Sequence, residues 1–244
     1  MTVDDLSAYE HRVSYGDDPG RDRWEVRVVN RWISAALPAL LDVAPAGAVL
    51  DVGCGEQPFR ALVGARRRGY VGMDVIQNSS QTVTVFGDLE HVEASATPYP
   101  FVLCTEVLEH VVDIDLSFRG LRRLTAPGGF VMMTVPFLFP VHMEPYDFRR
   151  LTQYGVARLA ADHGFEVVSS ARLGSASEAL ATLVEDISIL PAARTLRSRA
   201  KARMLRAAKA WLVAQLDAPS LSDHVSINSN YYLSNGIVLK AIEG

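Results

Sequence analysis

Short apolar runs alternate along this chain with longer segments in which apolar residues recur every three to four positions. Runs of the first kind predict β-strands at residues 48–52, 70–75, 82–86, 101–104, 130–135, 165–169 and 236–242. Segments of the second kind predict α-helices over residues 24–41, 59–68, 112–124 and 153–163. Strands and helices that alternate in this way are typical of an α/β fold, a doubly wound sheet with helices on both faces.

Turn signals separate these predicted elements. The stretch 127–129, Pro-Gly-Gly, stands before the strand at 130–135 and predicts a turn there. Thr152 is placed to cap the helix that follows it, and Gly164 to end that helix. A helix-prone run over 191–216 lies between the last two predicted strands, so we expect a helical insert before the final strand.

The segment 48–56 carries the strongest chemical signal in the chain. An apolar strand leads straight into Gly53, Cys54 and Gly55, and glycines let the backbone turn tightly and approach a ligand where a Cβ would clash. Asp51 is a carboxylate inside that apolar strand, and it can accept hydrogen bonds from turn amides or bind a cation directly or through water. This pattern predicts a site for a nucleoside-like ligand and therefore a cofactor-using enzyme.

Two further aspartates follow neighbouring strands. Asp74 closes the next strand roughly twenty residues beyond the glycine turn, where a carboxylate can accept both hydroxyls of a ribose. Asp88 follows the strand at 82–86 and is placed to accept a hydrogen bond from an adenine amino group. An aspartate at a strand end is often a turn or helix cap, but its combination with the glycine turn favours the ligand role.

Composition narrows the class of protein. The 244 residues, of which 49% are hydrophobic, suffice for one large α/β domain, and the net charge of -4 gives no reason to expect a nucleic-acid partner. Cys54 and Cys104 lack metal-ligand spacing, so we expect no metal site and a reducing, cytoplasmic setting. Residues 1–31 lack the apolar core of a signal peptide, and no apolar run reaches the roughly 18 residues of a membrane span.

Five sequence blocks occur together and in order, and they resemble the class I S-adenosylmethionine-dependent methyltransferases, particularly the small-molecule "type 11" branch. The blocks are Val49–Gly55, Asp74, Asp88, Cys104–Val111 and Leu124–Gly129. The resemblance covers roughly residues 45–170. It implies a Rossmann-like, mostly parallel sheet of seven strands whose last strand is antiparallel, with S-adenosylmethionine bound across the carboxyl edge of the first strands.

Carried over position by position, the resemblance assigns the contacts of the cofactor. Those around its methionine portion are Asp51, Gly53, Cys54 and Gly55. Those around its nucleoside are Asp74 on the ribose, Val75 and Ile76 against adenine, and Asp88 with Leu89 at the adenine edge; Thr105 and Glu106 line the sulfonium side. The chain departs from the family at Gln57 and Pro58, where relatives usually have a further glycine, so the loop should be stiffer.

A second group of candidate residues follows the strand at 130–135, where catalytic loops cluster. It resembles a pattern of His, then Pro, then Asp-Phe/Tyr-x-Arg-x-Thr, which His142, Asp147, Arg149 and Thr152 match. With a hydroxyl acceptor, His142 would remove the proton, since the pKa of histidine lies near working pH, and Asp147 would orient the imidazole. Tyr146 and Arg149 are the candidate substrate-binding residues.

Structural roles for the same residues stay open beside these catalytic ones. Asp147 and Arg149 could pair with each other or cap the helix that opens near residue 152, and His142 could satisfy backbone carbonyls in a tight loop. His110 stands at a recurrent position of the family, and its role is divided between helix entry and a cofactor contact.

The segments outside the cofactor-binding core, which spans 45–170, have less specific sequences. Residues 1–44 predict a helical lid region in which the candidate lid residues are Tyr9, His11, Tyr15 and Trp24, although plain packing is the favoured role of these side chains. Residues 175–230 form the insert, and its basic residues are Arg194, Arg197, Arg199, Lys201, Arg203, Arg206 and Lys209. Peripheral contact with an anionic membrane is one reading of this insert, and a solvated helix that covers the active site is the favoured one. Residues 231–244 form the last strand.

These features together predict a single-domain methyltransferase that transfers a methyl group from S-adenosylmethionine to a hydroxyl, or an amine, of a small molecule. A sugar or a natural-product intermediate is the expected acceptor class, and a homodimer is a further expectation. Two alternatives stay open: a non-catalytic binding module or partner subunit, and a nicotinamide-dependent oxidoreductase. Pro58 weighs against the oxidoreductase, because it replaces the third glycine that allows close packing beside a pyrophosphate.

Overall fold

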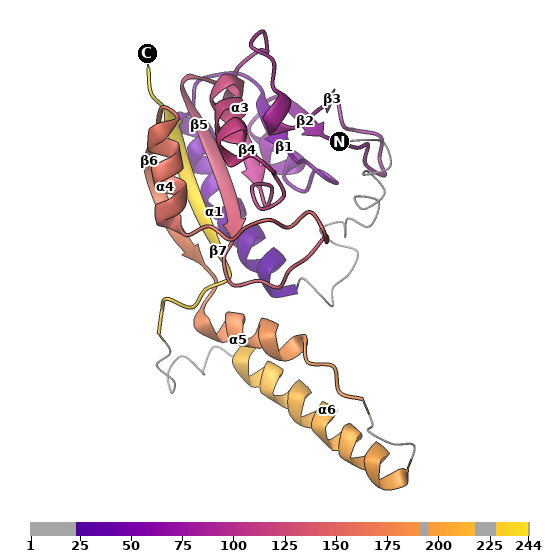
Figure 1. The fold of residues 1–244 in the computed structure, drawn as a ribbon. Coiled ribbons are helices and arrows are strands. Elements are labelled where there is room, and N and C mark those ends of the chain that lie inside the picture. Colours follow the sequence, from indigo (N-terminus) through magenta and orange to yellow (C-terminus); the bar gives the residue numbers. More distant parts are fainter. Residues whose placement is uncertain (1–22, 191–194, 218–227, 244) are drawn as a thin grey trace.

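The computed structural model describes residues 23–190, 195–217 and 228–243 of the chain. Its centre is a seven-stranded sheet in the order β3-β2-β1-β4-β5-β7-β6 (Figure 1). The strands are β1 (Val49–Val52), β2 (Tyr70–Asp74), β3 (Val85–Phe86), β4 (Tyr99–Thr105), β5 (Thr125–Pro136), β6 (Phe165–Leu173) and β7 (Ser234–Ala241). The first five strands pair in parallel, whereas β7 is antiparallel to both β5 and β6. The predicted fold class is confirmed.

Helices cover both faces of this sheet (Figure 1). They are α1 (Arg23–Val43), α2 (Arg60–Ala65), the 3-10 helix η2 (Leu89–His91), α3 (Ile114–Leu124), α4 (Gln153–Asp162), α5 (Ala176–Glu185) and α6 (Leu196–Asp217). One hydrophobic cluster joins the sheet to α1 and α2, and a second joins it to α3 and α4. The sheet is therefore the middle layer of three.

Strand β1 shows how the sequence produces these layers. Successive side chains of a strand point to opposite faces, so Val49 packs with Ile33 of α1 whereas Leu50 packs with Phe118 of α3. All four residues of β1 are buried. Burial on both faces explains the apolar sequence of β1, and it makes the carboxylate of Asp51 exceptional.

Three predicted strands differ from the structure by three residues or more at one end, and the helix predicted at 59–68 ends at Ala65. The strand predicted at 82–86 is limited to the exposed pair Val85–Phe86, which pairs on one side with β2 at the edge of the sheet. The predicted turn at 127–129 lies inside β5, where Gly128 has φ +70° and the register with β4 shifts; the glycines form a bulge instead of a turn. Strand β6 runs on to Leu173 because β7 pairs with its whole length.

The predicted caps of α4 are confirmed. The hydroxyl of Thr152 accepts a 3.1 Å hydrogen bond from the amide of Gly155, and Gly164 follows the helix with φ +77°. Helix α5, which the sequence analysis did not predict, opens with a reciprocal cap between Ser175 and Glu178. Side-chain caps thus fix where both helices begin.

The predicted lid residues Tyr9, His11 and Tyr15 lie outside the described residues. Trp24 is described, and its side chain is buried in the core. Its Nε1 donates a 2.8 Å hydrogen bond to Glu185 of α5. Trp24 therefore joins α1 to α5, in agreement with the packing role that the sequence favoured over a role in the lid.

Helices α5 and α6 lie side by side and project from the body of the protein (Figure 1). The ammonium group of Lys209 holds them together by donating to the carbonyl of Ile187 at 2.8 Å. Helix α6 begins at Leu196, and it extends away from the sheet instead of covering the active site as expected. Within the described residues, no helix is long and apolar enough to cross a membrane.

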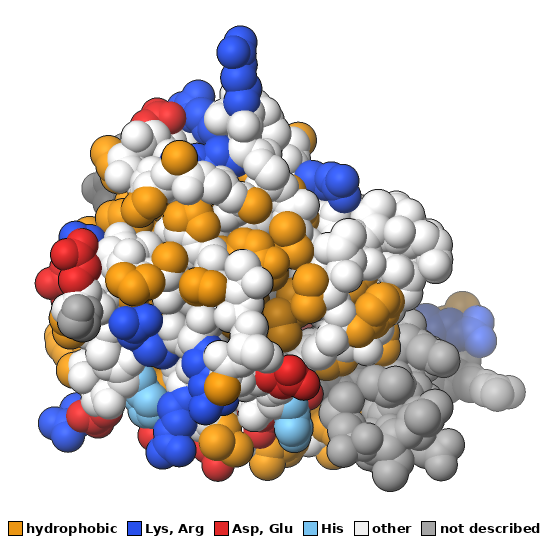
Figure 2. Space-filling model, turned by 90° about the horizontal axis from the view of Figure 1, so that it is seen from above, with side chains coloured by type: hydrophobic (Ala, Val, Ile, Leu, Met, Phe, Trp, Pro, Cys, Tyr) orange, Lys and Arg blue, Asp and Glu red, His pale blue; other side chains and the backbone are white. Residues whose placement is uncertain are grey.

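Figure 2 shows the face at the opposite end from the α5 and α6 hairpin. Apolar side chains form its middle, and Lys and Arg side chains lie at several separate places on it instead of in one patch.

Candidate active site

The turn after β1 requires glycine at its first position. Gly53 has φ +63°, and a Cβ there would lie 2.4 Å from Cγ2 of Val107. Gly55 has φ +47° with open space where its Cβ would stand. The side chain of Cys54 is turned inward and buried, so this turn presents backbone and open space at the carboxyl edge of the sheet.

Asp51 reaches this turn from inside the sheet. One carboxylate oxygen accepts a hydrogen bond from the hydroxyl of Tyr70, and the other, Oδ1, has no hydrogen-bond partner among the described residues. Burial, with a smaller contribution from the charge of Asp74, raises the pKa of Asp51 to about 7. A buried acceptor without a partner fits a site that takes up a cationic or hydrogen-donating ligand.

Asp74 fastens the glycine turn to the end of β2. Its carboxylate accepts hydrogen bonds from the amide of Gly55 at 3.0 Å and from that of Val75 at 2.7 Å. Ile76 follows with its amide 3.5 Å from the same carboxylate. The turn-capping role and the predicted ribose contact are compatible, because a carboxylate has about four acceptor positions.

Asp88 and Leu89 lie at the start of the 3-10 helix η2. The carboxylate of Asp88 accepts from the amides of Glu90 and His91 at 2.9 and 3.0 Å, so it caps η2. The side chain of Leu89 is buried in the cluster with α3. Their contacts with adenine stay predictions, and the capping alternative has direct support for Asp88.

Three carboxylates gather at the end of β4, which leads from Thr105 into Glu106; those of Glu25 and Glu109 are buried, and Glu106 is partly exposed. Glu106 has a left-handed backbone with φ +52°, and burial raises its pKa to about 7. Burial also raises the pKa of Glu25 and of Glu109 well above the usual range, and repulsion from Glu106 adds to both shifts. Glu25 is not among the residues predicted from the sequence; it comes from α1, and its carboxylate accepts a 2.7 Å hydrogen bond from the hydroxyl of Ser234.

The loop after β5 brings His142 and Asp147 together as predicted. The carboxylate of Asp147 accepts from the backbone amide of His142 at 3.0 Å and lies 3.3 Å from its imidazole Nδ1. Arg150 donates to the same carboxylate at 2.7 Å. Burial works to raise the pKa of Asp147, but the hydrogen bonds from Arg150 and from the His142 amide hold it below its usual range.

Tyr146 and Arg149 use backbone contacts to dock this loop. The carbonyl of Tyr146 lies 2.7 Å from Nδ1 of His110. The guanidinium of Arg149 donates to the carbonyls of Leu108, Val111 and Val112, the last at 2.8 Å. These contacts support a structural role for Arg149, and substrate binding by either residue stays a prediction.

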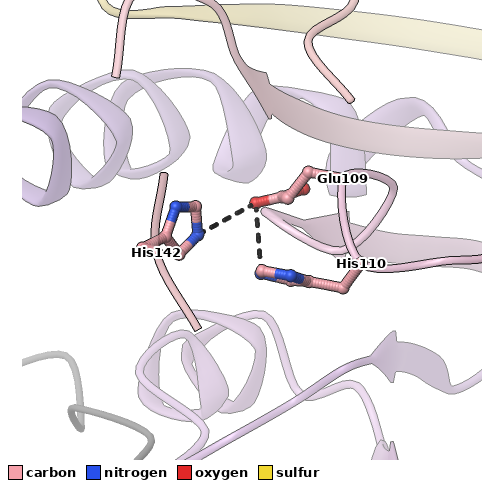
Figure 3. A group of neighbouring side chains, drawn as sticks. All are labelled: Glu109, His110 and His142. Atoms are coloured by element: carbon pink, nitrogen blue, oxygen red, sulfur yellow. Dashed lines mark ion pairs between the residues drawn. The ribbon is translucent and has the colours of Figure 1, made fainter. Parts of the chain in front are cut away.

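Docking of the loop brings together three side chains that the sequence analysis did not group. Oε1 of Glu109 lies 3.6 Å from Nε2 of His110 and 3.8 Å from Nε2 of His142 (Figure 3). The missed signal was the spacing of Glu106, Glu109 and His110, since two acids and a histidine within five residues after a buried strand are costly unless they serve a site.

Comparisons with known proteins agree with this geometry. Residues 23–179 match the family described as methyltransferase domain. A ubiquinone biosynthesis O-methyltransferase from Bordetella avium is 31% identical in an alignment 123 positions long, which covers 42% of this chain and 51% of that protein. The chain thus matches about half the length of this relative.

Solved structures show the same fold. A 1,6-didemethyltoxoflavin-N1-methyltransferase from Burkholderia thailandensis, with bound S-adenosylhomocysteine, is similar with a TM-score of 0.58 and 16% identity over 98% of this chain and 88% of that one. A SAM-dependent methyltransferase from Archaeoglobus fulgidus has a TM-score of 0.55 and 12% identity over 98% and 100%. The chain therefore belongs to the methyltransferase domain family and has the fold of the class I S-adenosylmethionine-dependent methyltransferases.

Proposed function

We propose that this methyltransferase transfers a methyl group from S-adenosylmethionine to a hydroxyl oxygen of a small molecule, with a sugar or a natural-product intermediate as the acceptor class. The observation that carries the proposal is the pair of His142 and Asp147 at the end of β5. It supplies an oriented imidazole at the sheet edge where the cofactor residues lie. The O-methyltransferase among the relatives favours oxygen, and an amine is the alternative acceptor.

The residues at the carboxyl edge fit the cofactor. When bound, S-adenosylmethionine supplies an electrophilic methyl group on a sulfonium ion. The unpartnered Oδ1 of Asp51 suits the ammonium group of its methionine portion, and the open space beside Gly55 admits that portion. Asp74 is the proposed ribose partner, and Glu106, whose pKa burial raises to about 7, is the proposed neighbour of the sulfonium group.

The transfer itself needs an oxygen lone pair in line with the methyl-sulfur bond. The oxygen-carbon bond forms as the carbon-sulfur bond breaks, and the sulfur keeps that electron pair. The hydroxyl proton must leave the acceptor. In this proposal Nε2 of His142 receives it. The carboxylate of Asp147 and the carbonyl of Pro140 both face Nδ1 as acceptors, so Nδ1 carries the hydrogen and Nε2 is left as the basic nitrogen.

Calorimetric titration with S-adenosylhomocysteine, NADH and NADPH tests the cofactor assignment. We expect binding of S-adenosylhomocysteine alone, weakened at least about 10-fold in Asp74→Ala, since a buried charged acceptor is lost. Arg158→Ala is the matched control, because Arg158 pairs with Asp162 on the exposed face of α4. Preferential binding of a nicotinamide would support the oxidoreductase alternative.

A non-catalytic binding module would also bind S-adenosylhomocysteine, so turnover needs its own test. Methyl-labelled S-adenosylmethionine with a panel of hydroxylated and amino acceptors distinguishes an enzyme from a binding module. Label on an oxygen of the product supports the proposal. Label on nitrogen favours the amine alternative, and the absence of label with every acceptor favours the module.

We also propose that the hairpin of α5 and α6 contacts a second copy of the chain or an anionic membrane. Exposed apolar side chains on it support this, namely Leu183, Ile187, Met204 and Trp211, beside exposed basic ones such as Arg203. Light scattering reports the dimer, and sedimentation with anionic vesicles reports the membrane contact. The chain has only two cysteines, Cys54 and Cys104, and both are buried, which supports the proposed cytoplasmic location.

A further inference from the structure

We propose that Glu109, His110 and His142 bind a divalent transition-metal ion. One carboxylate oxygen and two imidazole nitrogens converge at the place where the turn after β4 meets the loop after β5 (Figure 3). The three ligand atoms all lie within 4.8 Å of one another.

The hydrogen-bond partners of the two imidazoles decide which ring nitrogens carry hydrogen. Nδ1 of His110 faces the carbonyl oxygen of Tyr146 at 2.7 Å, and a carbonyl can only accept. Nδ1 of His142 faces the carbonyl of Pro140 and the carboxylate of Asp147, both at 3.3 Å. Each Nδ1 is therefore the donor of its ring, and each Nε2 presents a lone pair toward Glu109.

Glu109 does not satisfy these lone pairs in either protonation state. Its side chain is 1% exposed, and neither oxygen has a hydrogen-bond partner among the described residues. The imidazole nitrogens, at 3.6 and 3.8 Å, are beyond hydrogen-bond distance. Three acceptors that face one point, one of them a buried carboxylate, constitute the donor set of a cation site.

The distances suit a metal ion. A transition metal binds nitrogen and oxygen ligands at about 2.1 Å, so its ligand atoms lie within about 4.2 Å of one another. Both separations from Glu109 meet this limit, and the ligand nitrogens of the two imidazoles lie within 4.8 Å of each other. Outer contacts of the kind seen in metal sites are already present: Asp147 orients His142, and the carbonyl of Tyr146 orients His110.

The surrounding charges also favour a cation. Glu25 and Glu106 both lie close enough to Glu109 for their negative charges to repel its carboxylate, and a bound cation relieves this repulsion. The positive charge of Arg150 also acts on Glu109. The guanidinium of Arg150 is paired, however, with the carboxylate of Asp147. Two nitrogens and one oxygen select Zn²⁺, Co²⁺, Mn²⁺ or Fe²⁺ over Mg²⁺ and Ca²⁺, which prefer oxygen ligands.

Three protein ligands leave coordination positions open for water or for another ligand. If the proposed O-methylation holds, on which this step rests, the acceptor hydroxyl takes such a position. Coordination lowers the pKa of a bound hydroxyl, so its proton passes to solvent and the oxygen keeps the electron pair that attacks the methyl group. His142 then acts as a metal ligand, and the metal ion replaces it as the group that ionises the hydroxyl.

Metal binding can be measured without any acceptor. Chelator-treated, full-length protein is titrated with Co²⁺, and the visible absorption of the bound ion reports a nitrogen-containing coordination sphere. We expect one ion per chain in the wild-type protein. Glu109→Gln and His142→Asn should each weaken binding more than about 100-fold, because loss of even an outer-sphere partner costs about 10- to 100-fold.

His163→Asn is the matched control. His163 also lies near a carboxylate, with Nε2 3.4 Å from Asp115, and its Nδ1 also faces a carbonyl, but it lies outside the cluster. It should bind Co²⁺ like the wild type. Circular dichroism checks the folding of each variant, and His110→Asn replaces any variant that does not fold.

The outcomes separate this inference from the proposed function. Wild-type protein that binds no Co²⁺, Zn²⁺ or Mn²⁺, or Glu109→Gln and His142→Asn variants that bind Co²⁺ like the wild type, would overturn the metal site. Calorimetry with S-adenosylhomocysteine on the same samples reports the cofactor site independently. Metal binding without cofactor binding supports the inference and contradicts the proposed function; the reverse result contradicts the inference alone.

Discussion

The backbone amide of Phe148 donates a 2.8 Å hydrogen bond to the carbonyl of Glu109. This bond joins the loop after β5 to the turn after β4, although the two residues are 39 positions apart in the sequence (148 − 109). Arg149, next in the chain, extends the same seam by binding the carbonyls of Leu108 and Val112. The relative position of Glu109 and His142 is thus fixed by backbone contacts that are independent of both side chains.

Arg149→Ala should destabilise the protein because it leaves three loop carbonyls without their donor. Hydrogen bonds from a charged group contribute about 1.5 to 3 kcal/mol, and partial exposure reduces this, so we expect a loss of about 2 kcal/mol in the free energy of unfolding. Urea denaturation measures it. Arg158→Ala, which breaks an exposed pair with Asp162, should change it by less than about 1 kcal/mol. Unchanged stability together with a raised KM would instead support substrate binding by Arg149.

Gly53→Ala should cost about 2 to 4 kcal/mol of stability. A left-handed backbone costs a residue with a Cβ about 1 to 2 kcal/mol, and the contact of 2.4 Å with Val107 adds the cost of overpacking, about 1 to 3 kcal/mol. The double variant with Val107→Ala removes that contact. Thermal unfolding of the four proteins should therefore show a favourable coupling of about 1 to 3 kcal/mol; additive effects would contradict the steric account.

The sheet could be predicted from the sequence because its strands are buried on both faces. β1, apart from Asp51, and β4 are mostly apolar runs between turn signals, and they are too short to be helices. The edge strand β3 was overestimated since the sequence 82–86 has strand propensity but only Val85 and Phe86 have a partner strand. Helix α5 was missed because the sequence analysis treated 175–230 as one basic insert.

The candidate site likewise contains some residues that could be predicted from the sequence and others that could not. Asp51, Asp74 and the glycines could be identified since they stand at strand ends, where order along the chain fixes position in space. The approach of His142 to Glu109 could not be predicted, because it depends on how a loop docks through backbone carbonyls. The expectation of no metal site rested on cysteine spacing, which carries no information about histidine and glutamate ligands.

His142→Ala should lower the rate of methyl transfer about 100-fold or more in a single turnover, whether the imidazole acts as a base or as a metal ligand. Affinity for S-adenosylhomocysteine should stay unchanged, since His142 lies on the loop after β5 and the glycine turn does not contain it. Rapid-quench measurement with the identified acceptor tests this. His163→Ala is the control, and an unaltered rate in His142→Ala at every pH would exclude both roles.

Asp51 should make stability depend on pH. Its pKa is about 7 in the folded protein and about 3.9 in an unfolded chain. The folded state therefore holds a proton that the unfolded state releases, so the contribution of Asp51 is fully present below about pH 4 and is lost as the pH rises to about 7. The loss amounts to about 4 kcal/mol, of which about 2 to 3 kcal/mol falls between pH 5 and pH 8.

Asp51→Asn isolates this effect, because the amide oxygen still accepts from the hydroxyl of Tyr70 but does not ionise. The free energy of unfolding of the variant minus that of the wild type should rise by about 2 to 3 kcal/mol from pH 5 to pH 8. Urea denaturation at the two pH values gives this difference, and the titration of Glu25, Glu106 and Glu109 cancels in it. A difference that stays constant with pH would mean that Asp51 is ionised in the folded protein throughout, with a cation or water at its Oδ1.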